Sequence, residues 1–227
     1  MTLNYNIQTQ SVTLQTHQVK LYSVDQLDLK SQLDQVQQYL SVTELQRLAS
    51  LTHKAVHQQF IVSRGILRYI LSQYTGQAPA AIDIKTSAKG KPYIEPSAIY
   101  FNVSHSAARL VVAISTQVQV GVDIEFINKN RQFKRVVQRY FTQLEQQQLA
   151  QQSVNQYPLL FYKYWTAKEA WAKCIGVGLN FPFQQHCVQK AMVSNTISVM
   201  AADLQPTKLS FSWVDVGPDY QGCIAIL

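Results

Sequence analysis

The chain has 227 residues, of which 47% are hydrophobic and 15% are charged. This is the composition of an ordinary folded protein and excludes a disordered chain. No stretch approaches the roughly 18–20 consecutive apolar residues that cross a bilayer, and the N-terminal residues lack the charged and apolar regions of a signal peptide. Three widely spaced cysteines offer neither a disulfide framework nor a CxxC metal site. We therefore expect a soluble, unexported protein of the reducing cytoplasm.

Basic residues outnumber acidic ones by 20 to 13, which gives a net charge of +7 and a pI near 9.3. Such a surface attracts anions over long distances. Nucleic acid, a phosphorylated small molecule and an acidic partner protein all satisfy this condition, so composition alone does not choose among them.

The predicted elements form two rounds of helices followed by strands. Helical spacing runs through residues 25–72 and is clearest at 59–73. Short β-branched and aromatic runs then indicate antiparallel strands at 81–84, 97–104, 109–115 and 117–125. Helical spacing returns at 131–152 and is strong at 161–175, before further strand-like runs at 208–216 and 223–227. This order predicts an α+β fold with two lobes, residues 1–119 and 120–227.

Two carboxylates alternate along one predicted strand, in the segment GVDIE. Asp123 and Glu125 share the face opposite to Val122 and Ile124, with backbones about 7 Å apart. Oxygen ligands at this spacing suit Mg²⁺. The alternative is the solvated outer face of an edge strand.

A narrow polar strip marks the predicted helix FYKYWTAKEAWAKCIG, which is otherwise mostly apolar and must be largely buried. Glu169 and Lys173 lie one turn apart in this strip. A thin polar strip on a buried helix tends to face a cleft. The alternative is an exposed ion pair of little energetic weight.

Two segments between and within the predicted strands combine cations and hydroxyls. Lys89 and Lys91 flank a glycine in AKGKPY, and Ser104, His105 and Ser106 lie at a strand end in FNVSHS. Together with backbone N–H groups they could hold phosphates. The alternative is a surface turn and a loop histidine.

Basic residues recur every four positions along the predicted helix after the carboxylate strand. Arg131, Arg135 and Arg139 form one face, which is either solvated or a docking surface for an acidic partner. Glu145, just beyond, has the position of a carboxylate at a helix start.

The motifs KGKPY, FNVSHS, GVDIE, RYFTQLE and FYKYWTAKEAWAKCIGVGL, in this order, resemble those of the Sfp-type 4′-phosphopantetheinyl transferases. The resemblance implies two similar lobes related by pseudo-twofold symmetry, each an antiparallel sheet packed with helices, with the active site in the cleft between them. It also implies Mg²⁺-dependent transfer of 4′-phosphopantetheine from coenzyme A to a serine of a carrier protein, releasing 3′,5′-ADP.

The resemblance further implies roles for single residues. Mg²⁺ would be held by Asp123, Glu125 and Glu169. Coenzyme A phosphates would be held by Lys91, Ser104, His105 and Lys173, and with less support by Lys89 and Arg64. Either Glu169 or Glu145 would remove the serine proton. One departure concerns Gln58 and Gln59, which stand where relatives often carry arginine.

The expected partners are acidic carrier proteins and coenzyme A, without nucleic acid or membrane, and a chain that supplies both lobes could act as a monomer. Two alternatives stay open. One is a basic module that binds nucleic acid or an acidic protein without catalysis. The other is a degenerate transferase that binds coenzyme A without turnover.

Overall fold

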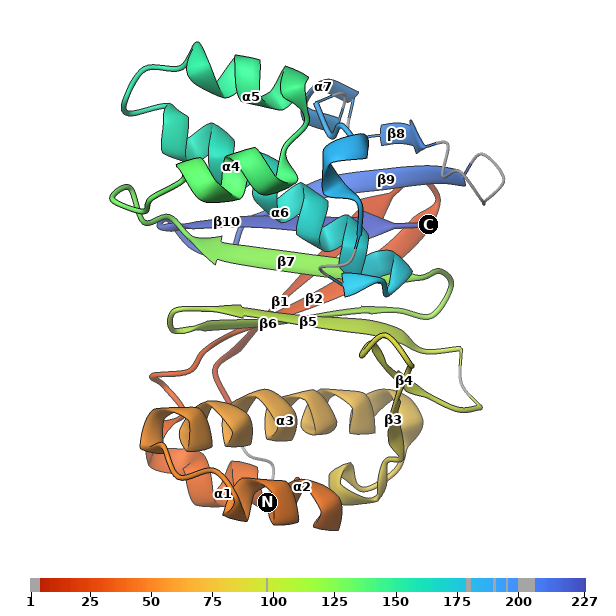
Figure 1. The fold of residues 1–227 in the computed structure, drawn as a ribbon. Helices are drawn as coiled ribbons and strands as arrows, with labels where there is room; N and C mark the ends of the chain where they lie inside the picture. Colours follow the sequence, from red (N-terminus) through yellow and green to blue (C-terminus); the bar gives the residue numbers. More distant parts are fainter. Residues whose placement is uncertain (1–4, 97, 179–180, 190, 195, 200–206) are drawn as a thin grey trace.

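Two four-stranded antiparallel sheets lie face to face at the centre of the protein, with helices on the outer side of each sheet (Figure 1). The computed structural model describes residues 5–96, 98–178, 181–189, 191–194, 196–199 and 207–227. Residue 97, the first of one predicted strand, lies outside these ranges. The predicted α+β class is confirmed. Among the described helices, none is long and apolar enough to cross a membrane.

The first half of the chain builds a four-stranded sheet in the order β1-β2-β6-β5, a separate two-stranded sheet of β3 and β4, and the helices that cover the larger sheet. Its elements are β1 (Ile7–Leu14), β2 (His17–Asp25), α1 (Leu33–Gln37), α2 (Val42–Ala49), α3 (Lys54–Thr75), β3 (Ile84–Thr86), β4 (Pro92–Ile94), β5 (Tyr100–Ser106) and β6 (Arg109–Ser115). The sequence did not predict the hairpin of β1 and β2. Most residues of β1 are exposed and polar because it is an edge strand, so the alternation that reveals a half-buried strand is weak there.

The second half builds the other sheet, in the order β7-β10-β9-β8. Its elements are β7 (Val120–Phe126), α4 (Lys134–Tyr140), α5 (Gln143–Ala150), α6 (Tyr157–Ile175), α7 (Ala191–Ser194), β8 (Thr196–Val199), β9 (Thr207–Val214) and β10 (Tyr220–Ile226). The helical region expected at residues 131–152 consists of two helices. The chain turns between them because Phe141 is extended and Thr142 begins α5 with a capping box.

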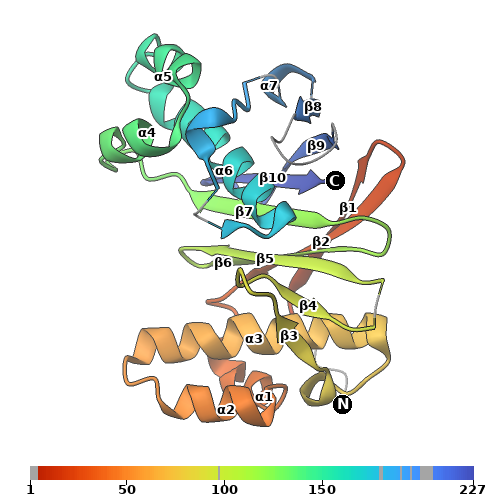
Figure 2. The same cartoon turned by 45° about the vertical axis from the view of Figure 1, so that its right-hand side comes forward.

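An aliphatic core joins the inner faces of the two sheets. Val120, Val122 and Ile124 of β7 lie in one buried cluster with Val111 and Ala113 of β6. The apolar face predicted for this strand is therefore confirmed. Figure 2 shows β7 running between the first sheet and helix α6. The division of the chain at residues 119 and 120, and the pseudo-twofold relation of its halves, stay predictions.

Helix α6 crosses β7 in direct backbone contact, and Gly121 makes this possible. A Cβ atom at Gly121 would lie 2.0 Å from the carbonyl oxygen of Ala170, closer than any real contact. Because no side chain separates the two backbones, the polar strip of α6 comes to lie beside the carboxylates of β7.

Candidate active site between the two sheets

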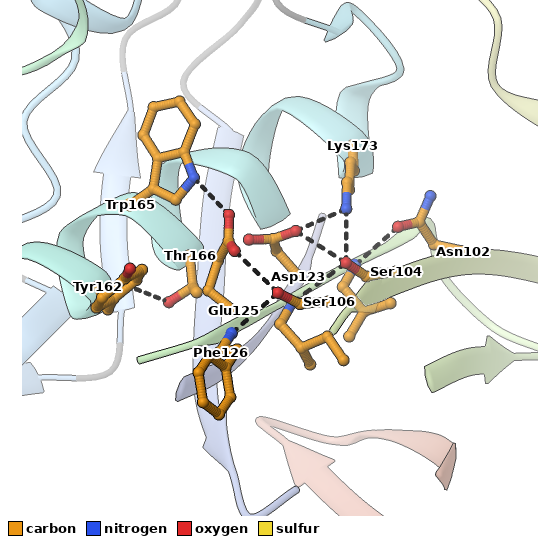
Figure 3. A network of polar contacts seen from close by, with 12 residues as sticks. Asn102, Ser104, Ser106, Asp123, Glu125, Phe126, Tyr162, Trp165, Thr166 and Lys173 are labelled. Atoms are coloured by element: carbon orange, nitrogen blue, oxygen red, sulfur yellow. Dashed lines mark hydrogen bonds and ion pairs between the residues drawn. The ribbon is translucent and has the colours of Figure 1, made fainter. Parts of the chain in front are cut away.

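A ladder of side chains joins the edges of the two sheets. The N–H groups along β7 donate to side chains at alternate positions of β5: Val122 to Asn102 at 3.0 Å, Ile124 to Ser104 at 3.2 Å and Phe126 to Ser106 at 2.9 Å (Figure 3). An edge strand leaves such N–H groups without a strand partner, and here side chains replace it. The ladder fixes the register of β7 against β5, and with it the position of both carboxylates.

Asp123 is the most deeply buried carboxylate of this network, with 5% of the residue exposed. Its Oδ1 accepts hydrogen bonds from Ser104 Oγ at 2.9 Å and Lys173 Nζ at 2.7 Å. Its Oδ2 is buried and has no hydrogen-bond partner. Burial raises the pKa of Asp123, and the Lys173 ammonium opposes the shift. One carboxylate oxygen is thus left to accept a further ligand.

Both oxygens of Glu125 are held by protein donors. Ser106 Oγ donates to Oε2 at 3.1 Å, and Trp165 Nε1 donates to Oε1 at 2.9 Å. Burial and the charge of Asp123 raise the pKa of Glu125, while these two donors and Arg131 lower it. Of the three arginines in the predicted basic face, Arg131 is therefore near the network.

The polar strip predicted on α6 is confirmed. Between residues 161 and 174 the helix is buried except at Lys163, Glu169 and Lys173. Burial and the charges of Asp123 and Glu125 raise the pKa of Glu169 to about 7, although Lys173 lowers it. Lys173 also donates to Ser104 Oγ at 2.9 Å. Three carboxylates from β7 and α6 therefore lie within electrostatic reach of one another.

The three carboxylates fit a divalent cation in chemistry rather than as a preformed cage. Within the ranges that the structure covers, no three acidic, histidine or cysteine side chains meet closely enough to hold a metal as they stand. The donor set is nevertheless the oxygen-rich kind that Mg²⁺ prefers. The mutual repulsion of the three groups and the unpartnered Oδ2 of Asp123 are both relieved by added positive charge.

A cavity of about 750 Å³ opens between residues 87–95 and the end of α6. No residue of the carboxylate network lines it, but Cys174, the neighbour of Lys173 in the chain, does. Lys89 and Lys91 both line it. Lys91 Nζ is held at 2.6 Å from the Cys174 carbonyl and at 2.9 Å from Gln119 Oε1, and burial lowers its pKa. The KGKPY loop is thereby attached to the C-terminal end of α6, one residue beyond Lys173.

His105 lies on the exposed side of β5 next to the network. Partial burial and the Lys173 ammonium lower the pKa of His105, whereas Asp123 raises it. The hydroxyl of Ser104 is engaged with Asp123 and Lys173. The structure brings these residues together, and their contacts with coenzyme A stay predictions.

Two predicted site residues lie elsewhere. Glu145 has no exposed surface, and its carboxylate accepts from Thr142 N, Lys168 Nζ and Val188 N at 2.8–2.9 Å. Arg64 lies on α3, where its Nε is 3.9 Å from Glu44 Oε1. In the described part of the chain neither residue contacts the carboxylate network, so their predicted roles gain no support from this conformation.

Asn102 and Trp165 were not among the predicted site residues. Ser106 was predicted only as a possible phosphate contact and Arg131 only as part of a basic docking face, not as neighbours of Glu125. A signal for Asn102 and Ser106 was present, because Asn102, Ser104 and Ser106 alternate along a predicted strand and so share a face. Trp165 carried no such signal, since an aromatic residue on a buried helix is usually core.

Two family profiles together match most of the chain. The profile of the 4′-phosphopantetheinyl transferase superfamily matches residues 119–225, and the profile named 4′-phosphopantetheinyl transferase, N-terminal, matches residues 28–117.

Individual relatives carry the same description. The chain is 30% identical to the 4′-phosphopantetheinyl transferase HetI of Nostoc sp. over 173 residues, which span 74% of this chain and 73% of HetI. It is 25% identical to the 4′-phosphopantetheinyl transferase psf-1 of Bacillus pumilus over 72% of this chain and 69% of the relative. It is 27% identical to the L-aminoadipate-semialdehyde dehydrogenase-phosphopantetheinyl transferase of Mus musculus over 63% of this chain and 50% of that protein.

Proposed function

Because the chain belongs to the 4′-phosphopantetheinyl transferase superfamily, we propose that the network of Asp123, Glu125, Glu169 and Lys173 is its catalytic centre. The family assigns the reaction: the enzyme uses coenzyme A as substrate and transfers phosphopantetheine to a carrier protein. One observation supports the location above all others. Helix α6 brings Lys173 into contact with Asp123 at 2.7 Å, and burial together with the charges of Asp123 and Glu125 raises the pKa of Glu169 to about 7.

Asp123, Glu125 and Glu169 would hold Mg²⁺, and the ion would supply positive charge beside the diphosphate of coenzyme A. The protein's own residues add to this neutralisation. Lys173 already donates to Asp123 Oδ1 and to Ser104 Oγ, and its ammonium can reach a phosphate oxygen from the same strip of α6. Lys89, Lys91 and His105 would hold the remaining phosphates, since the two lysines line the cavity at the end of α6 and His105 is near enough to Lys173 for the ammonium to lower its pKa. Lys91 would exchange one of its three protein acceptors, Gln119 Oε1 or the carbonyls of Val120 and Cys174, for a phosphate oxygen.

The transfer requires the carrier serine to attack the phosphorus that carries the pantetheine. The bond to the second phosphate breaks, 3′,5′-ADP leaves, and the hydroxyl proton passes to a base. Of the two glutamates considered, Glu169 suits this step better, because it is partly exposed while Glu145 is enclosed by three protein donors. Lys173 would stabilise the negative charge that develops on the phosphate oxygen of the departing 3′,5′-ADP.

The carrier is acidic and the enzyme acts as a monomer in the cytoplasm under this proposal. The net charge of +7 favours an acidic partner as well as coenzyme A. Arg135 and Arg139 of α4 are exposed and would be available for docking, although Arg139 also packs over the ring of Tyr140 at 5.3 Å. Arg131 is half-buried and packs over the ring of Phe161 at 5.8 Å.

The test is transfer itself. Incubation with coenzyme A, Mg²⁺ and a panel of apo carrier proteins should add the mass of one phosphopantetheine to a carrier, and a chelator should stop the addition. Glu169→Gln should abolish transfer in a protein that remains folded. Unchanged turnover in this variant, or in the presence of chelator, would remove the carboxylate network from the mechanism. Salt-sensitive binding to generic DNA that persists in Asp123→Ala, without transfer to any carrier, would instead support a basic binding module.

A further inference from the structure

Glu125 differs from the other two carboxylates because the protein grips both of its oxygens. Ser106 and Trp165 approach it from different elements, β5 and α6, and each donates to a different oxygen. Asp123, by contrast, has one oxygen without a partner. Figure 3 shows the Glu125 carboxylate between the indole and the serine hydroxyl.

A backbone N–H that donates to Ser106 Oγ leaves the hydroxyl hydrogen of Ser106 for Glu125. Ser106 Oγ accepts the N–H of Phe126 at 2.9 Å, so that N–H cannot share its hydrogen with Glu125. A hydroxyl has one hydrogen to donate, and here Glu125 Oε2 receives it at 3.1 Å. The orientation of Glu125 is therefore tied to the rung of the ladder that also fixes the end of β7.

The indole of Trp165 has little freedom to turn. Its ring lies among Tyr140, Phe141, Phe161 and Phe183, with centroids 5.3–6.4 Å away, and only 8% of the residue is exposed. An indole nitrogen is a donor only, so the N–H directed at Oε1 cannot change its role. Aromatic packing in the second half of the chain thus holds a donor at the site.

We propose that Ser106 and Trp165 are positioning residues, which hold the Glu125 carboxylate in the orientation needed to bind a divalent cation. This inference rests on the proposed function, because it takes Glu125 as a ligand. Each oxygen of Glu125 accepts one protein hydrogen bond and keeps a further lone pair for a cation. Partners that orient a metal ligand commonly contribute about 10–100-fold to metal affinity.

Mn²⁺ serves as the probe, because its free concentration can be followed by electron paramagnetic resonance while it stands in for Mg²⁺. Trp165→Phe keeps a ring in the aromatic cluster but removes the donor together with the smaller ring of the indole, and Ser106→Ala removes the hydroxyl. Both variants should bind Mn²⁺ about 10–100-fold more weakly than the unaltered protein, with coenzyme A present at equal concentration. Ser106→Thr, which keeps the hydroxyl, should restore most of the affinity.

The matched control is Trp171→Phe, the same substitution on the same helix. Trp171 packs against Phe181 and His186, with centroids 4.9 Å away, and among the described residues it makes no hydrogen bond to Glu125, so its replacement should leave Mn²⁺ affinity within twofold. Thermal unfolding identifies any variant that fails to fold. If Trp165→Phe does not fold, the comparison of Ser106→Ala with Ser106→Thr tests the proposal alone.

The outcomes separate the two proposals. Saturable Mn²⁺ binding that is lost in Glu125→Gln but unchanged in Ser106→Ala and Trp165→Phe would overturn the positioning role and leave the proposed centre intact. No saturable binding by the unaltered protein would overturn the metal site and the positioning role together.

Discussion

Two lysines on helix α6 pair with carboxylates, yet their surroundings differ completely. Lys168 and its partner Glu145 have no exposed surface, and Nζ donates to Glu145 Oε2 at 2.9 Å and to the carbonyls of Phe183 and His186. Lys173 pairs with Asp123 at 2.7 Å, but its side chain is 27% exposed and Asp123 Oδ2 has no partner. We call Lys168 and Glu145 the closed pair, and Lys173 and Asp123 the open pair.

The hydrogen bonds of the closed pair all connect parts of the fold. Lys168 supplies three donors and all three are used, while Glu145 also caps α5 and accepts from Val188 N. It therefore ties the start of α5, the middle of α6 and residues 183–188 together. The open pair leaves Asp123 Oδ2 without a hydrogen-bond partner and part of Lys173 exposed, so both can still bind a ligand.

The largest effect should come from breaking the closed pair. Lys168→Met leaves Glu145 buried without its counter-charge, and removing one partner of a buried pair commonly costs about 3–5 kcal/mol. We expect a loss of this size in the free energy of unfolding, measured by urea denaturation. A loss below 1 kcal/mol would show that the pair does not hold these segments together.

The open pair should give the opposite result. Lys173→Met removes the cation placed to stabilise the negative charge on the departing 3′,5′-ADP, so transfer should fall about 100-fold or more. Its free energy of unfolding should change by less than half the loss seen in Lys168→Met, because Lys173 is partly exposed and Asp123 can take up a proton. Steady-state transfer rates and urea denaturation check the two parts, and a variant that transfers normally would place Lys173 outside the reaction.

The sequence distinguished these two regions only in part. It predicted the alternation in β7 and the polar strip of α6, because burial of one face leaves a periodic pattern of residue types. It gave Glu145 two readings, a helix-start carboxylate and a base near the acceptor, and the structure shows the cap directly. The partnership of Glu145 with Lys168 could not be predicted, because it joins residues 23 positions apart through tertiary packing.

The hydrogen bonds between β5 and β7 could likewise be predicted only in part. Asn102, Ser104 and Ser106 could be placed on one face from their spacing, but not opposite the N–H groups of β7. That placement depends on how two separate sheets meet. The resemblance of the motifs predicted one metal site for the three carboxylates, which the structure brings within electrostatic reach of one another. The donors that orient Glu125 came only from the structure.

The backbone contact that brings α6 over β7 is the next point to test. Gly121→Ala forces a Cβ against the carbonyl oxygen of Ala170, which cannot rotate away, so we expect a loss of about 1–3 kcal/mol and a displaced α6. Transfer should fall with it, because Glu169 and Lys173 move with the helix. Gly222→Ala is the matched control on the neighbouring strand. Its Cβ would meet the Val214 side chain first, at 2.8 Å, so its effect should be smaller, and equal unfolding energies for the two variants would contradict the special role of the α6 contact.

The smallest effect concerns the energetic cost of the open site. The pKa of Glu169 is raised in the folded protein from its ordinary 4.5 to about 7. A carboxylate whose folded pKa is raised binds protons more tightly when folded, so the folded state loses stability as pH rises from about 4.5 through 7.

Glu169→Gln removes this loss. With chelator present, the variant should therefore be more stable than the unaltered protein at pH 8, by about 1 kcal/mol after allowance for solvent screening, and the difference should shrink towards pH 5. Thermal unfolding at both pH values measures it. A variant that is less stable at pH 8 would mean that the Glu169 carboxylate stabilises the fold, as Lys168 does, and does not belong to an open reacting centre.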